Sequence, residues 1–395
     1  MMSADTSIKG RLENVVIACG GTGGHLFPGL AVGQELRQRN CAVTLMVSPK
    51  DVDQQAIHSI AGMGIVTLPA VGLNRTRVLQ FVHGMWRSYR VARACFLQRP
   101  PKFVLAMGGF ISAPPILAAR RFGAKTFLHE SNSIPGRANR RLARWVDGAF
   151  VYFPAAADNL AAKRVEVVGM PVRPQFLEPM TPAAARKAMG LDPEAPVLLV
   201  MGGSQGAHKV NELVLGIAPQ LREAVANLQF VHLTGEYDLE PVRARYKELA
   251  IPAAVHAFWS EMGTALAAAD VAVSRAGASS LAELAARQLP AVLIPYPSAA
   301  HNHQYYNAQS FVQTGAARMF AQSSPAPDHL ACEILDLIRN PQKRSAMQAA
   351  LAEWNAPAAA GEIAERILNW PAEAKHPVHL PAPKLKPHNL GSLNA

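Results

Sequence analysis

The sequence predicts an α/β fold with two halves, each built on a doubly wound parallel sheet. Three features support this: short apolar, β-branched runs recur, each ends in a turn, and each is followed by a helical stretch. Strands that alternate with helices predict parallel sheets covered on both faces, and nearly continuous apolar runs fit strands buried on both sides. Half of the 395 residues are apolar and 17% are charged, which excludes a wholly disordered or fibrous chain.

The expected strands form two groups. The first group is Asn14–Cys19, Ala42–Val47, Ile65–Pro69, Phe103–Met107, Lys125–Leu128, Ala149–Phe153 and Glu166–Val168. The second group is Val197–Met201, Gln229–Leu233, Ala254–Phe258, Val271–Ser274 and Ala291–Ile294. Prolines cluster between them, so we expect a first domain of residues 1–175 and a second of residues 176–370. A helix around Leu351–Ile367 is a candidate to pack back on the first domain, and residues 371–395 predict a disordered tail.

Composition limits the compartment and the partners. The apolar run at Val15–Cys19 is too short for a signal peptide, and the uncharged stretch Phe103–Ala119 is interrupted by glycines and prolines, so no membrane span is expected. The four cysteines form no CxxC pair, which favours reduced thiols in the cytosol. The net charge of +11 favours an anionic partner, whether nucleic acid, an acidic membrane surface or a phosphorylated substrate.

Three expected strands end in glycine-rich turns. The turns are Gly20-Gly21-Thr22-Gly23-Gly24-His25, Gly108-Gly109-Phe110-Ile111-Ser112 and Gly202-Gly203-Ser204-Gln205-Gly206, and the first and third lead into expected helices at Leu30–Gln38 and Val210–Leu215. Glycine lets the backbone approach an oxygen-rich ligand, and free N–H groups at a helix start attract negative charge. Such glycines can also merely close tight turns, but three of them in a basic chain favour a phosphate-bearing ligand.

Better-known motifs explain these turns less well. The Rossmann fingerprint that starts at Gly21 needs a sixth-position glycine and finds Leu26, and no Gly-Lys dipeptide offers a Walker A loop. The third turn matches G-x-S-x-G through Ser204, with Asp270 and His301 following in the order of a serine hydrolase triad. A phosphate-binding turn is favoured instead, because the similar first turn lacks a central serine and no HGGG-type oxyanion loop is present.

Another strand-to-helix turn, Gly277 to Glu283, carries a carboxylate. Glu283 lies one turn into the expected helix, where an acid either accepts hydrogen bonds from sugar hydroxyls or only complements the helix dipole. The loop that follows, from residue 295 to 307, is rich in neutral donors and acceptors. His301 and His303 form an HxH pair, but no third ligand lies at a recognisable spacing, so we expect no metal site.

Residues 54–129 contain no Asp or Glu but ten Lys or Arg. Within this stretch, around residues 75–99, apolar and aromatic residues recur at three- and four-residue spacing beside Arg87, Arg90 and Arg93. A basic amphipathic helix of this kind can lie on an anionic bilayer surface, although a core helix with arginines toward solvent has the same pattern. We expect no nucleic-acid binding, because no recognised motif is present.

The motifs belong to a longer ordered set of segments between residue 14 and about residue 320. They are Gly20–Gly29, Gly108–Phe110, His129–Asn132, Val168–Arg173, Gly202–Ala207, Arg275–Ala278 with Glu283, and His303–Gln304 with Asn307. This set resembles glycosyltransferase family 28, in particular its members that make the lipid-linked disaccharide of bacterial cell walls. The resemblance implies a GT-B fold, in which two Rossmann-like domains face each other across a cleft that holds the active site.

The resemblance also implies a reaction: GlcNAc moves from UDP-GlcNAc to O4 of MurNAc in lipid I, giving lipid II with inversion at the anomeric carbon. The second domain would bind the donor, with Ser204 at the diphosphate, Glu283 at the ribose hydroxyls and Gln304 at the GlcNAc hydroxyls. Further implied donor contacts are Trp259, Ala278, Ser279, Ser280, Leu281 and Ala282, and across the cleft Thr22, Gly23, Gly24, Asn132 and Arg173. The acceptor diphosphate would be held by Gly20, Gly21, Gly108 and Gly109, and no cofactor or metal is implied.

Such a transfer needs a base for the attacking hydroxyl and stabilisation of the departing UDP. His25 is the candidate base, because the ordinary pKa of histidine lies near working pH and the residue follows a strand end. The alternatives are that His25 binds a phosphate and that Asn132 or a water lies near the acceptor oxygen. Arg173, Glu283 and the backbone N–H groups of Gly202–Gly206 complete the implied catalytic set.

The implied location is the cytoplasmic face of the cell membrane, with peripheral attachment through residues 75–99 to its anionic surface. Proteins of cell-wall synthesis and cell division are the implied protein partners. Two alternatives remain for the function: an enzyme of the same fold that acts like a UDP-GlcNAc 2-epimerase, and a membrane-surface scaffold that binds a nucleotide sugar without turnover.

Overall fold

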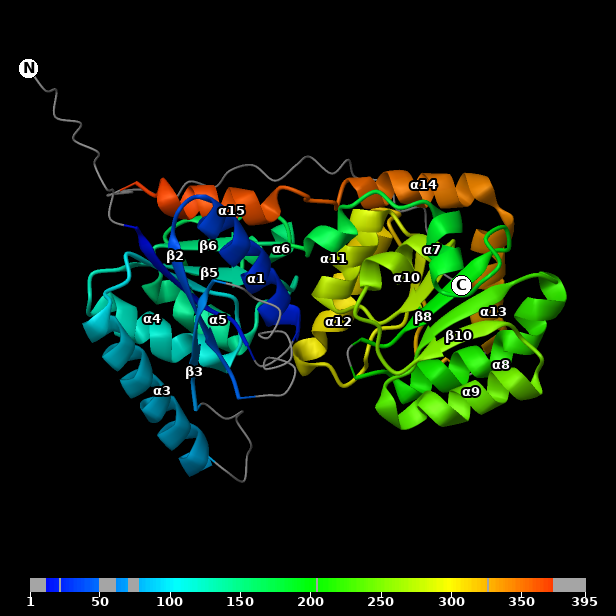
Figure 1. Ribbon diagram of the computed structural model, residues 1–395, viewed down its shortest axis with the longest axis horizontal. Helices are drawn as coiled ribbons and strands as arrows, with labels where there is room; N and C mark the ends of the chain where they lie inside the picture. The colour runs from blue at the N-terminus through cyan, green and yellow to red at the C-terminus, as the bar shows by residue number, and fades with distance from the viewer. Residues whose placement is uncertain are drawn as a thin grey trace, which may run out of the picture.

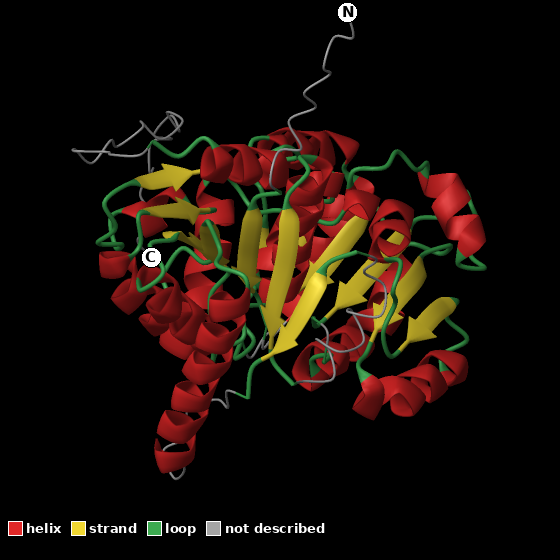
Figure 2. Ribbon diagram, turned by 60° about the vertical axis from the view of Figure 1, so that its left-hand side comes forward, coloured by secondary structure: helices red, strands yellow, loops and turns green. Residues whose placement is uncertain are grey.

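The computed structural model describes residues 12–20, 23–49, 62–69, 78–203, 205–324 and 327–371. Within these ranges the chain forms two separate sheets of parallel strands, with helices packed on the faces of each (Figure 1; Figure 2). This confirms the predicted α/β class. Residues 372–395 of the predicted tail lie outside the described ranges, as do Gly21, Thr22 and Ser204 of the predicted site.

The described part of the first sheet has seven strands in the order β3-β2-β1-β4-β5-β6-β7. Their bounds are β1 Asn14–Ala18, β2 Ala42–Val47, β3 Gly64–Thr67, β4 Phe103–Ala106, β5 Lys125–Glu130, β6 Gly148–Val151 and β7 Val165–Val167. Strands β1, β4 and β6 are buried at every position, as their continuous apolar sequences predict for a sheet covered on both faces.

The described part of the second sheet has six strands in the order β10-β9-β8-β11-β12-β13. Their bounds are β8 Val197–Met201, β9 Gln229–Leu233, β10 Ala253–His256, β11 Val271–Ser274, β12 Ala291–Leu293 and β13 Arg318–Met319. Every strand predicted from the sequence occurs within two residues of its predicted bounds. The boundary near residue 175 stays a prediction, and it falls in the connection between β7 and β8.

The helices around the first sheet are α1 Gly23–Gln38, α3 Val78–Gln98, α4 Ala113–Arg120, α5 Arg137–Leu142 and α6 Pro154–Ala157. Those of the second half are α7 Pro182–Ala188, α8 His208–Ala224, α9 Leu239–Glu248, α10 Met262–Ala268, α11 Ala278–Arg287, α12 His303–Gln313, α13 Pro327–Arg339 and α14 Pro341–Ala352. The last described helix is α15 Ala359–Leu368.

Helix α1 begins seven residues before the predicted start at Leu30. The predicted start lies just after Pro28 and Gly29, but Pro28 is buried inside α1. A proline in the second turn removes one intrahelical hydrogen bond, and burial of the helix against the sheet outweighs that loss. Helix α8 likewise extends past its predicted end at Leu215 and contains Pro219.

The single helix predicted around Leu351–Ile367 is interrupted: the range holds the end of α14 and most of α15. Pro357 lies in the connecting segment, where it cannot continue a helix. The connection passes so closely over Gly169 that a β-carbon there would overlap the side chain of Ala356. Figure 1 shows α15 lying along the first half beside α1, far from α13.

Helix α15 completes the core of the first half. Ile363, Ala364 and Ile367 are fully buried in a cluster with residues of β1, β2 and β4. The ring of Trp370 lies 4.9 Å from that of Phe127, centroid to centroid. The end of the described chain is therefore packed against the sheet with which the chain begins.

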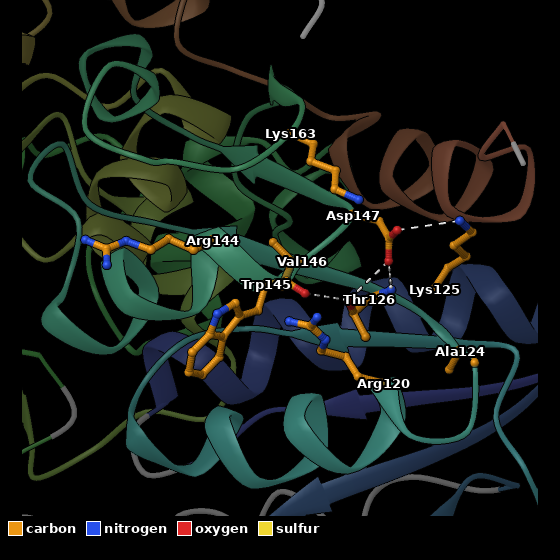
Figure 3. A pocket seen from close by; sticks show the side chains of 10 residues that line it. Arg120, Ala124, Lys125, Thr126, Arg144, Trp145, Val146, Asp147 and Lys163 are labelled. Atoms are coloured by element: carbon orange, nitrogen blue, oxygen red, sulfur yellow. Dashed lines mark hydrogen bonds and ion pairs between the residues drawn. The ribbon is translucent and has the colours of Figure 1, made fainter. Parts of the chain in front are cut away.

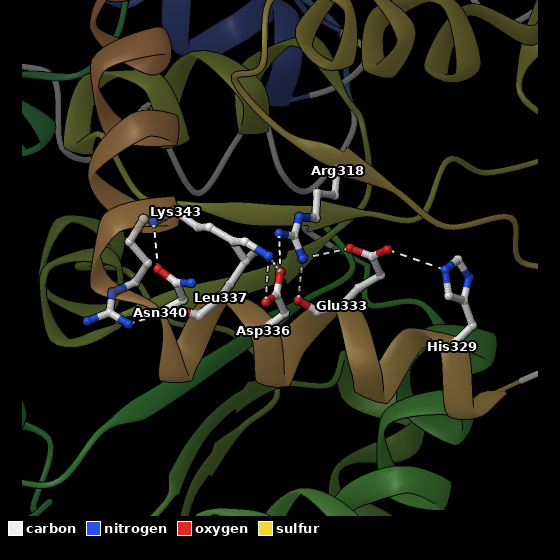
Figure 4. A network of polar contacts seen from close by, with 8 residues as sticks. Arg318, His329, Glu333, Asp336, Leu337, Asn340 and Lys343 are labelled. Atoms are coloured by element: carbon white, nitrogen blue, oxygen red, sulfur yellow. Dashed lines mark hydrogen bonds and ion pairs between the residues drawn. The ribbon is translucent and has the colours of Figure 1, made fainter. Parts of the chain in front are cut away.

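Strand β13 has only two residues and was not predicted. An ion-pair network secures it to two helices (Figure 4). The guanidinium of Arg318 lies 2.7 Å from Glu333 and 2.6 Å from Asp336, both on α13, and Lys343 of α14 lies 2.7 Å from Asp336. Tertiary charge pairs, which leave no periodic pattern, position this edge strand.

Each sheet has a point where the strand order reverses, between β1 and β4 in the first and between β8 and β11 in the second. In open α/β sheets, ligands bind outside the carboxyl ends of the strands at such points. Gly20 follows β1, Gly108 follows β4, and Gly202 follows β8. The glycine turns found in the sequence therefore lie where each sheet is open to a ligand.

Candidate active site

Two glycine turns meet at the carboxyl edge of the first sheet, beside His25. Gly108 and Gly109 follow β4 with φ of 112° and 76°, a region that favours glycine. A β-carbon on Gly108 would lie 2.9 Å from Cε1 of His25, and one on Gly109 would lie 3.9 Å from the carbonyl oxygen of Gly20. The structure thus brings together Gly20, His25, Gly108 and Gly109. Gly23 and Gly24 form the first turn of α1.

Ser112 fixes the shape of the second turn. Its hydroxyl donates to the carbonyl oxygen of Gly108 at 2.7 Å and accepts from the N–H of Gly108 at 3.2 Å. Behind the turn, burial lowers the pKa of His129 to about 4, with a further lowering from nearby His25. His129 is therefore neutral, and its Nε2 lies 3.0 Å from the carbonyl oxygen of Gly169.

The third glycine turn leads into α8. A β-carbon on Gly206 would overlap the carbonyl group of Thr234, so the turn packs against the end of β9. Ala207 precedes α8 and supplies no side-chain cap. The first N–H groups of a helix have no intrahelical acceptor, and a phosphate is a suitable partner for them.

Arg173 connects the two halves beside these turns. Its guanidinium stacks on the ring of Phe27 in α1 at 4.3 Å and on Phe176 at 5.0 Å. It also lies 3.7 Å from the carboxylate of Glu283 in α11. Arg173 and Glu283, which the sequence separates by 110 positions, therefore form one charged pair between α1 and α11.

Burial shifts the pKa of both partners. It raises the pKa of Glu283 from 4.5 to about 7, against the opposing effect of the Arg173 charge. Burial also lowers the pKa of Arg173, although the Glu283 charge raises it. Glu283 therefore exchanges its proton near neutral pH, which is typical of carboxylates at functional sites.

The other predicted donor residues of the second half lie in α11 and after β10. Ser279 and Ser280 lie half-buried in the first turn of α11, and the hydroxyl of Ser279 has no hydrogen-bond partner within the described residues. Leu281 and Ala282 point into the core, so only their backbone can face a ligand. The ring of Trp259, just after β10, lies 4.4 Å from that of His256, centroid to centroid, at an interplanar angle of 51°.

Gln304, at the start of α12, accepts a hydrogen bond from the N–H of Tyr296 at 2.9 Å. This contact fixes the side chain of Gln304 beside the loop that follows β12. The structure therefore places Gln304 and Glu283 on neighbouring helices of the second half, while Ser204 lies outside the described residues.

Glu130, at the end of β5, organises the loop that leaves the first sheet. It is 2% exposed, and its carboxylate accepts hydrogen bonds from the N–H and side-chain amide of Asn132, the N–H of Gly136 and the side-chain amide of Asn139. Four N–H donors thus satisfy the oxygens of this buried carboxyl group. This role could not be predicted from the sequence, because a carboxylate after a strand has the same pattern on a surface.

Asn307 of α12 joins this loop to the second half. It is fully buried, and its Oδ1 accepts from the N–H of Ser133 at 2.9 Å. Its Nδ2 donates to Oδ1 of Asn132 at 3.1 Å and to the carbonyl oxygen of Ala276 at 3.2 Å. The side-chain amide of Asn132 is thus already hydrogen-bonded to Glu130 and Asn307. Any contact between Asn132 and the sugar-donor substrate would compete with these bonds.

The serine hydrolase interpretation is wrong. Asp270 precedes β11 and accepts hydrogen bonds from Arg186 and from the N–H of Val197, both at 2.8 Å. It therefore lies at the amino edge of the second sheet, whereas Ser204 follows the carboxyl end of β8. His301 accepts a hydrogen bond from Arg137 at 2.8 Å instead of contacting Asp270.

Among the described residues, no group of three or more His, Cys, Asp or Glu could hold a metal ion.

Comparison with known proteins gives matches over most of the chain. Residues 15–151 match the glycosyltransferase family 28 N-terminal domain, and residues 197–366 match the family 28 C-terminal domain. The UDP-N-acetylglucosamine--N-acetylmuramyl-(pentapeptide) pyrophosphoryl-undecaprenol N-acetylglucosamine transferase of Anaeromyxobacter dehalogenans (strain 2CP-C) is 36% identical over 361 residues, covering 89% of this chain and 91% of the relative. The transferase of the same name from Geobacter sulfurreducens is 36% identical over 345 residues, covering 86% and 93%.

Solved structures share the two-sheet architecture. The crystal structure of MurG from Acinetobacter baumannii superposes with a TM-score of 0.71 at 25% identity, covering 91% of this chain and 99% of that chain. A UDP-GlcNAc 2-epimerase from Neisseria meningitidis bound to UDP-GlcNAc gives a TM-score of 0.67 at 14% identity, covering 90% and 99%. The second likeness is one of fold alone, and together they confirm the predicted GT-B fold.

We predict that Glu283→Gln flattens the pH dependence of stability. The folded protein binds this proton more tightly than the unfolded chain, because the pKa is raised to about 7. The resulting stabilisation is complete below the pKa of this carboxyl in the unfolded chain. It is lost as the pH rises through the pKa in the folded protein, and in all it amounts to up to about 3 kcal/mol. Urea unfolding from about pH 4 to pH 8 measures it. The exposed Glu353→Gln is the control, and an unchanged slope in Glu283→Gln would contradict the prediction.

We also predict that Asn307→Asp destabilises the protein by roughly 2–4 kcal/mol, because a carboxylate oxygen would face two acceptors in a buried site. Asn159→Asp changes an exposed amide in the same way and should have little effect. Thermal and urea unfolding of the two variants provide the comparison. Equal stabilities would show that the amide of Asn307 does not hold the halves together.

Proposed function

This chain belongs to glycosyltransferase family 28, and we propose that it transfers GlcNAc from UDP-GlcNAc to O4 of MurNAc in lipid I, forming lipid II for peptidoglycan synthesis. The observation that carries this proposal is 36% identity over 89% of the chain to a transferase whose name gives UDP-N-acetylglucosamine and N-acetylmuramyl-(pentapeptide) pyrophosphoryl-undecaprenol as its substrates. The family membership confirms the resemblance predicted from the motifs.

The second domain, residues 176–370, binds the donor in this proposal. The glycine turn after β8 and the start of α8 hold the diphosphate, with Ser204 as a hydroxyl donor. Glu283 accepts hydrogen bonds from the ribose hydroxyls, and Gln304 contacts the GlcNAc hydroxyls. The burial of Glu283 and its position in the first half of α11 support this assignment.

The first domain, residues 1–175, binds the acceptor. The turns at Gly20 and Gly108-Gly109 lie together and present backbone to a diphosphate. His25 lies against the same turn, which supports its role as the base. Thr22, Gly23, Gly24 and Asn132 contact the donor from this side of the cleft.

The reaction is a single displacement. The O4 hydroxyl of the acceptor attacks C1 of GlcNAc as the bond from C1 to the diphosphate oxygen breaks, and His25 takes the hydroxyl proton. The charge that develops on UDP is stabilised by the guanidinium of Arg173 and by backbone N–H groups of the third turn. Inversion at C1 follows from attack on the face opposite the leaving group.

We predict that Glu283→Ala lowers kcat/KM for UDP-GlcNAc about 100-fold or more, because two hydrogen bonds to a charged group would be lost. Transfer to a soluble lipid I analogue measures this, with Glu353→Ala as the control. The same assay with UDP-GalNAc in place of UDP-GlcNAc tests the preference for the sugar.

Conversion of UDP-GlcNAc without acceptor would support the epimerase alternative, and nucleotide-sugar binding with no turnover would support the scaffold.

We propose further that the enzyme is peripheral at the anionic cytoplasmic membrane surface and contacts it through α3. The buried residues of α3 occur at every fourth position, from Gly84 to Phe96. Other faces expose Val78, Leu79, Val82 and Trp86, with Leu79 85% exposed. Arg90 stacks over Trp86 at 4.8 Å. Exposed apolar residues beside arginines suit the interface of an anionic bilayer.

None of the helices in the described part of the chain has the length and apolar character of a membrane span.

We predict that Arg87→Glu with Arg90→Glu weakens binding to anionic vesicles by more than tenfold, and that added salt weakens wild-type binding, because the attraction is electrostatic. Sedimentation with vesicles measures both effects. Arg243→Glu with Arg245→Glu, on α9 of the second half, carries the same charge change as a control. Binding that responds to neither salt nor the α3 substitutions would refute this attachment.

Contacts with proteins of cell-wall synthesis and division remain part of the proposal.

A further inference from the structure

A chain of hydrogen bonds connects the core of the second half with the start of α8. It begins at the hydroxyl of Tyr246 on α9, which lies 3.0 Å from Nδ1 of His232 on β9. Nε2 of His232 lies 3.0 Å from Oδ1 of Asn211 on α8. The amide nitrogen of Asn211 donates to the carbonyl oxygen of Thr234 at 3.0 Å and to Oδ2 of Asp238 at 2.7 Å. The chain therefore ends at a carboxylate in the loop between β9 and α9.

Each bond in this chain has one possible direction. Both N–H groups of Asn211 donate, so its oxygen accepts, and His232 must donate from Nε2. Burial lowers the pKa of His232 to about 3, so the ring is neutral and its Nδ1 accepts from Tyr246. Asp238 only accepts in this network, and its side chain is 15% exposed. The chain thus holds a partly buried negative charge in one place.

Asp238 lies beside the third glycine turn. A β-carbon on Gly235, three residues earlier, would lie 2.4 Å from the carbonyl oxygen of Gln205, and one on Gly206 would lie 2.0 Å from that of Thr234. The loop that carries Asp238 is therefore interlocked with the turn that holds the donor diphosphate in the proposed function. A carboxylate at this place repels a diphosphate unless a cation neutralises it.

His208, the first residue of α8, supplies that cation. Its Nδ1 lies 2.9 Å from Oδ1 of Asp238, and its Nε2 lies 3.2 Å from Glu212. The hydrogen bond to Asp238, followed by the charges of Asp238 and Glu212, raises the pKa of His208 above its ordinary value of 6.5, against smaller effects of burial and Lys209. Lys209 pairs with Glu212 at 2.8 Å. In the part of the chain that the structure describes, His208 is the one cation paired with Asp238.

We propose that His208 is a positioning residue for the sugar donor: its imidazolium neutralises Asp238 beside the glycine turn, so that the diphosphate of UDP-GlcNAc can bind there. The inference rests on the proposed donor site and adds to it a dependence on one proton. An exposed pair of His208 with Glu212 alone would have little effect. The chain behind Asp238 makes the difference, because a fixed carboxylate cannot turn away from an incoming anion.

We expect His208→Gln to raise the KM for UDP-GlcNAc about fivefold at about pH 6, because glutamine can bond to Asp238 but carries no charge. The contribution of His208 is complete below its raised pKa and is lost as the pH rises through it. The ratio of the two KM values should therefore fall toward one between about pH 6 and about pH 9. Glu283 titrates in both proteins, so this ratio isolates His208. Transfer to a soluble lipid I analogue measures KM, and kcat and the KM for the acceptor should change less than about twofold.

Two further variants separate charge from shape. His208→Arg keeps a cation at every pH tested, so it should match wild type at low pH and lack the rise in KM that deprotonation of His208 causes. His208→Gln combined with Asp238→Asn removes both charges, and an amide in place of Asp238 can still accept from Asn211. The KM for UDP-GlcNAc should then return to within about twofold of wild type. If the double variant unfolds at a lower temperature, the arginine variant still decides between charge and shape.

The matched control is His329→Gln on α13. It removes an exposed imidazole that also pairs with a glutamate four residues on, within the network of Figure 4. Thermal unfolding checks the fold of every variant. The inference would be overturned by an equal KM in wild type and His208→Gln, by a loss that is the same at every pH, or by a loss that persists in the folded double variant.

Calorimetric binding of UDP-GlcNAc separates this inference from the proposed function. A wild-type protein that does not bind UDP-GlcNAc would refute the proposed function and the inference together. A wild-type protein that binds and transfers GlcNAc, with an affinity that no substitution of His208 alters, would refute the role of His208 alone.

Discussion

The active site depends on the buried hydrogen bonds that hold two separate sheets in one fixed relation. Asn307 provides them, because its one amide bonds to the loop after β5 and to the segment after β11. Glu130 in turn fixes that loop through four N–H donors. A polar group buried between two bodies is costly unless every partner is in place, so the contact tolerates only one geometry.

The same arrangement explains the charged pair between the halves. Arg173 can stack on Phe27 and meet Glu283 only when the carboxyl edges of the two sheets face each other. Burial then opposes the charge on both partners and brings the pKa of Glu283 near neutrality. An acid in this state is easily converted into a charged acceptor by a ligand that supplies hydrogen-bond donors.

The two edges of the first sheet carry different chemistry. At the carboxyl edge, two backbone turns and His25 lie together. At the amino edge, arginine and lysine side chains line an open pocket (Figure 3). The strands separate these edges, and α3 extends along the side of the sheet and away from the body (Figure 2).

The α/β class, the position of each long strand and the location of the glycine turns could be predicted from the sequence, because burial on both faces and close backbone approach leave local patterns. The predicted start of α1 was wrong because packing overrides Pro28, and the predicted C-terminal helix is interrupted near Pro357. The predicted packing of that segment on the first half agrees with the burial of α15. Strand β13, which distant ion pairs hold, was not predicted. The roles of Asn307 and Glu130, and the separation of Asp270 and His301 that rules out a triad with Ser204, became visible only in the folded chain. These depend on which strand ends share an edge, and that is set by sheet order and packing between residues far apart in the chain.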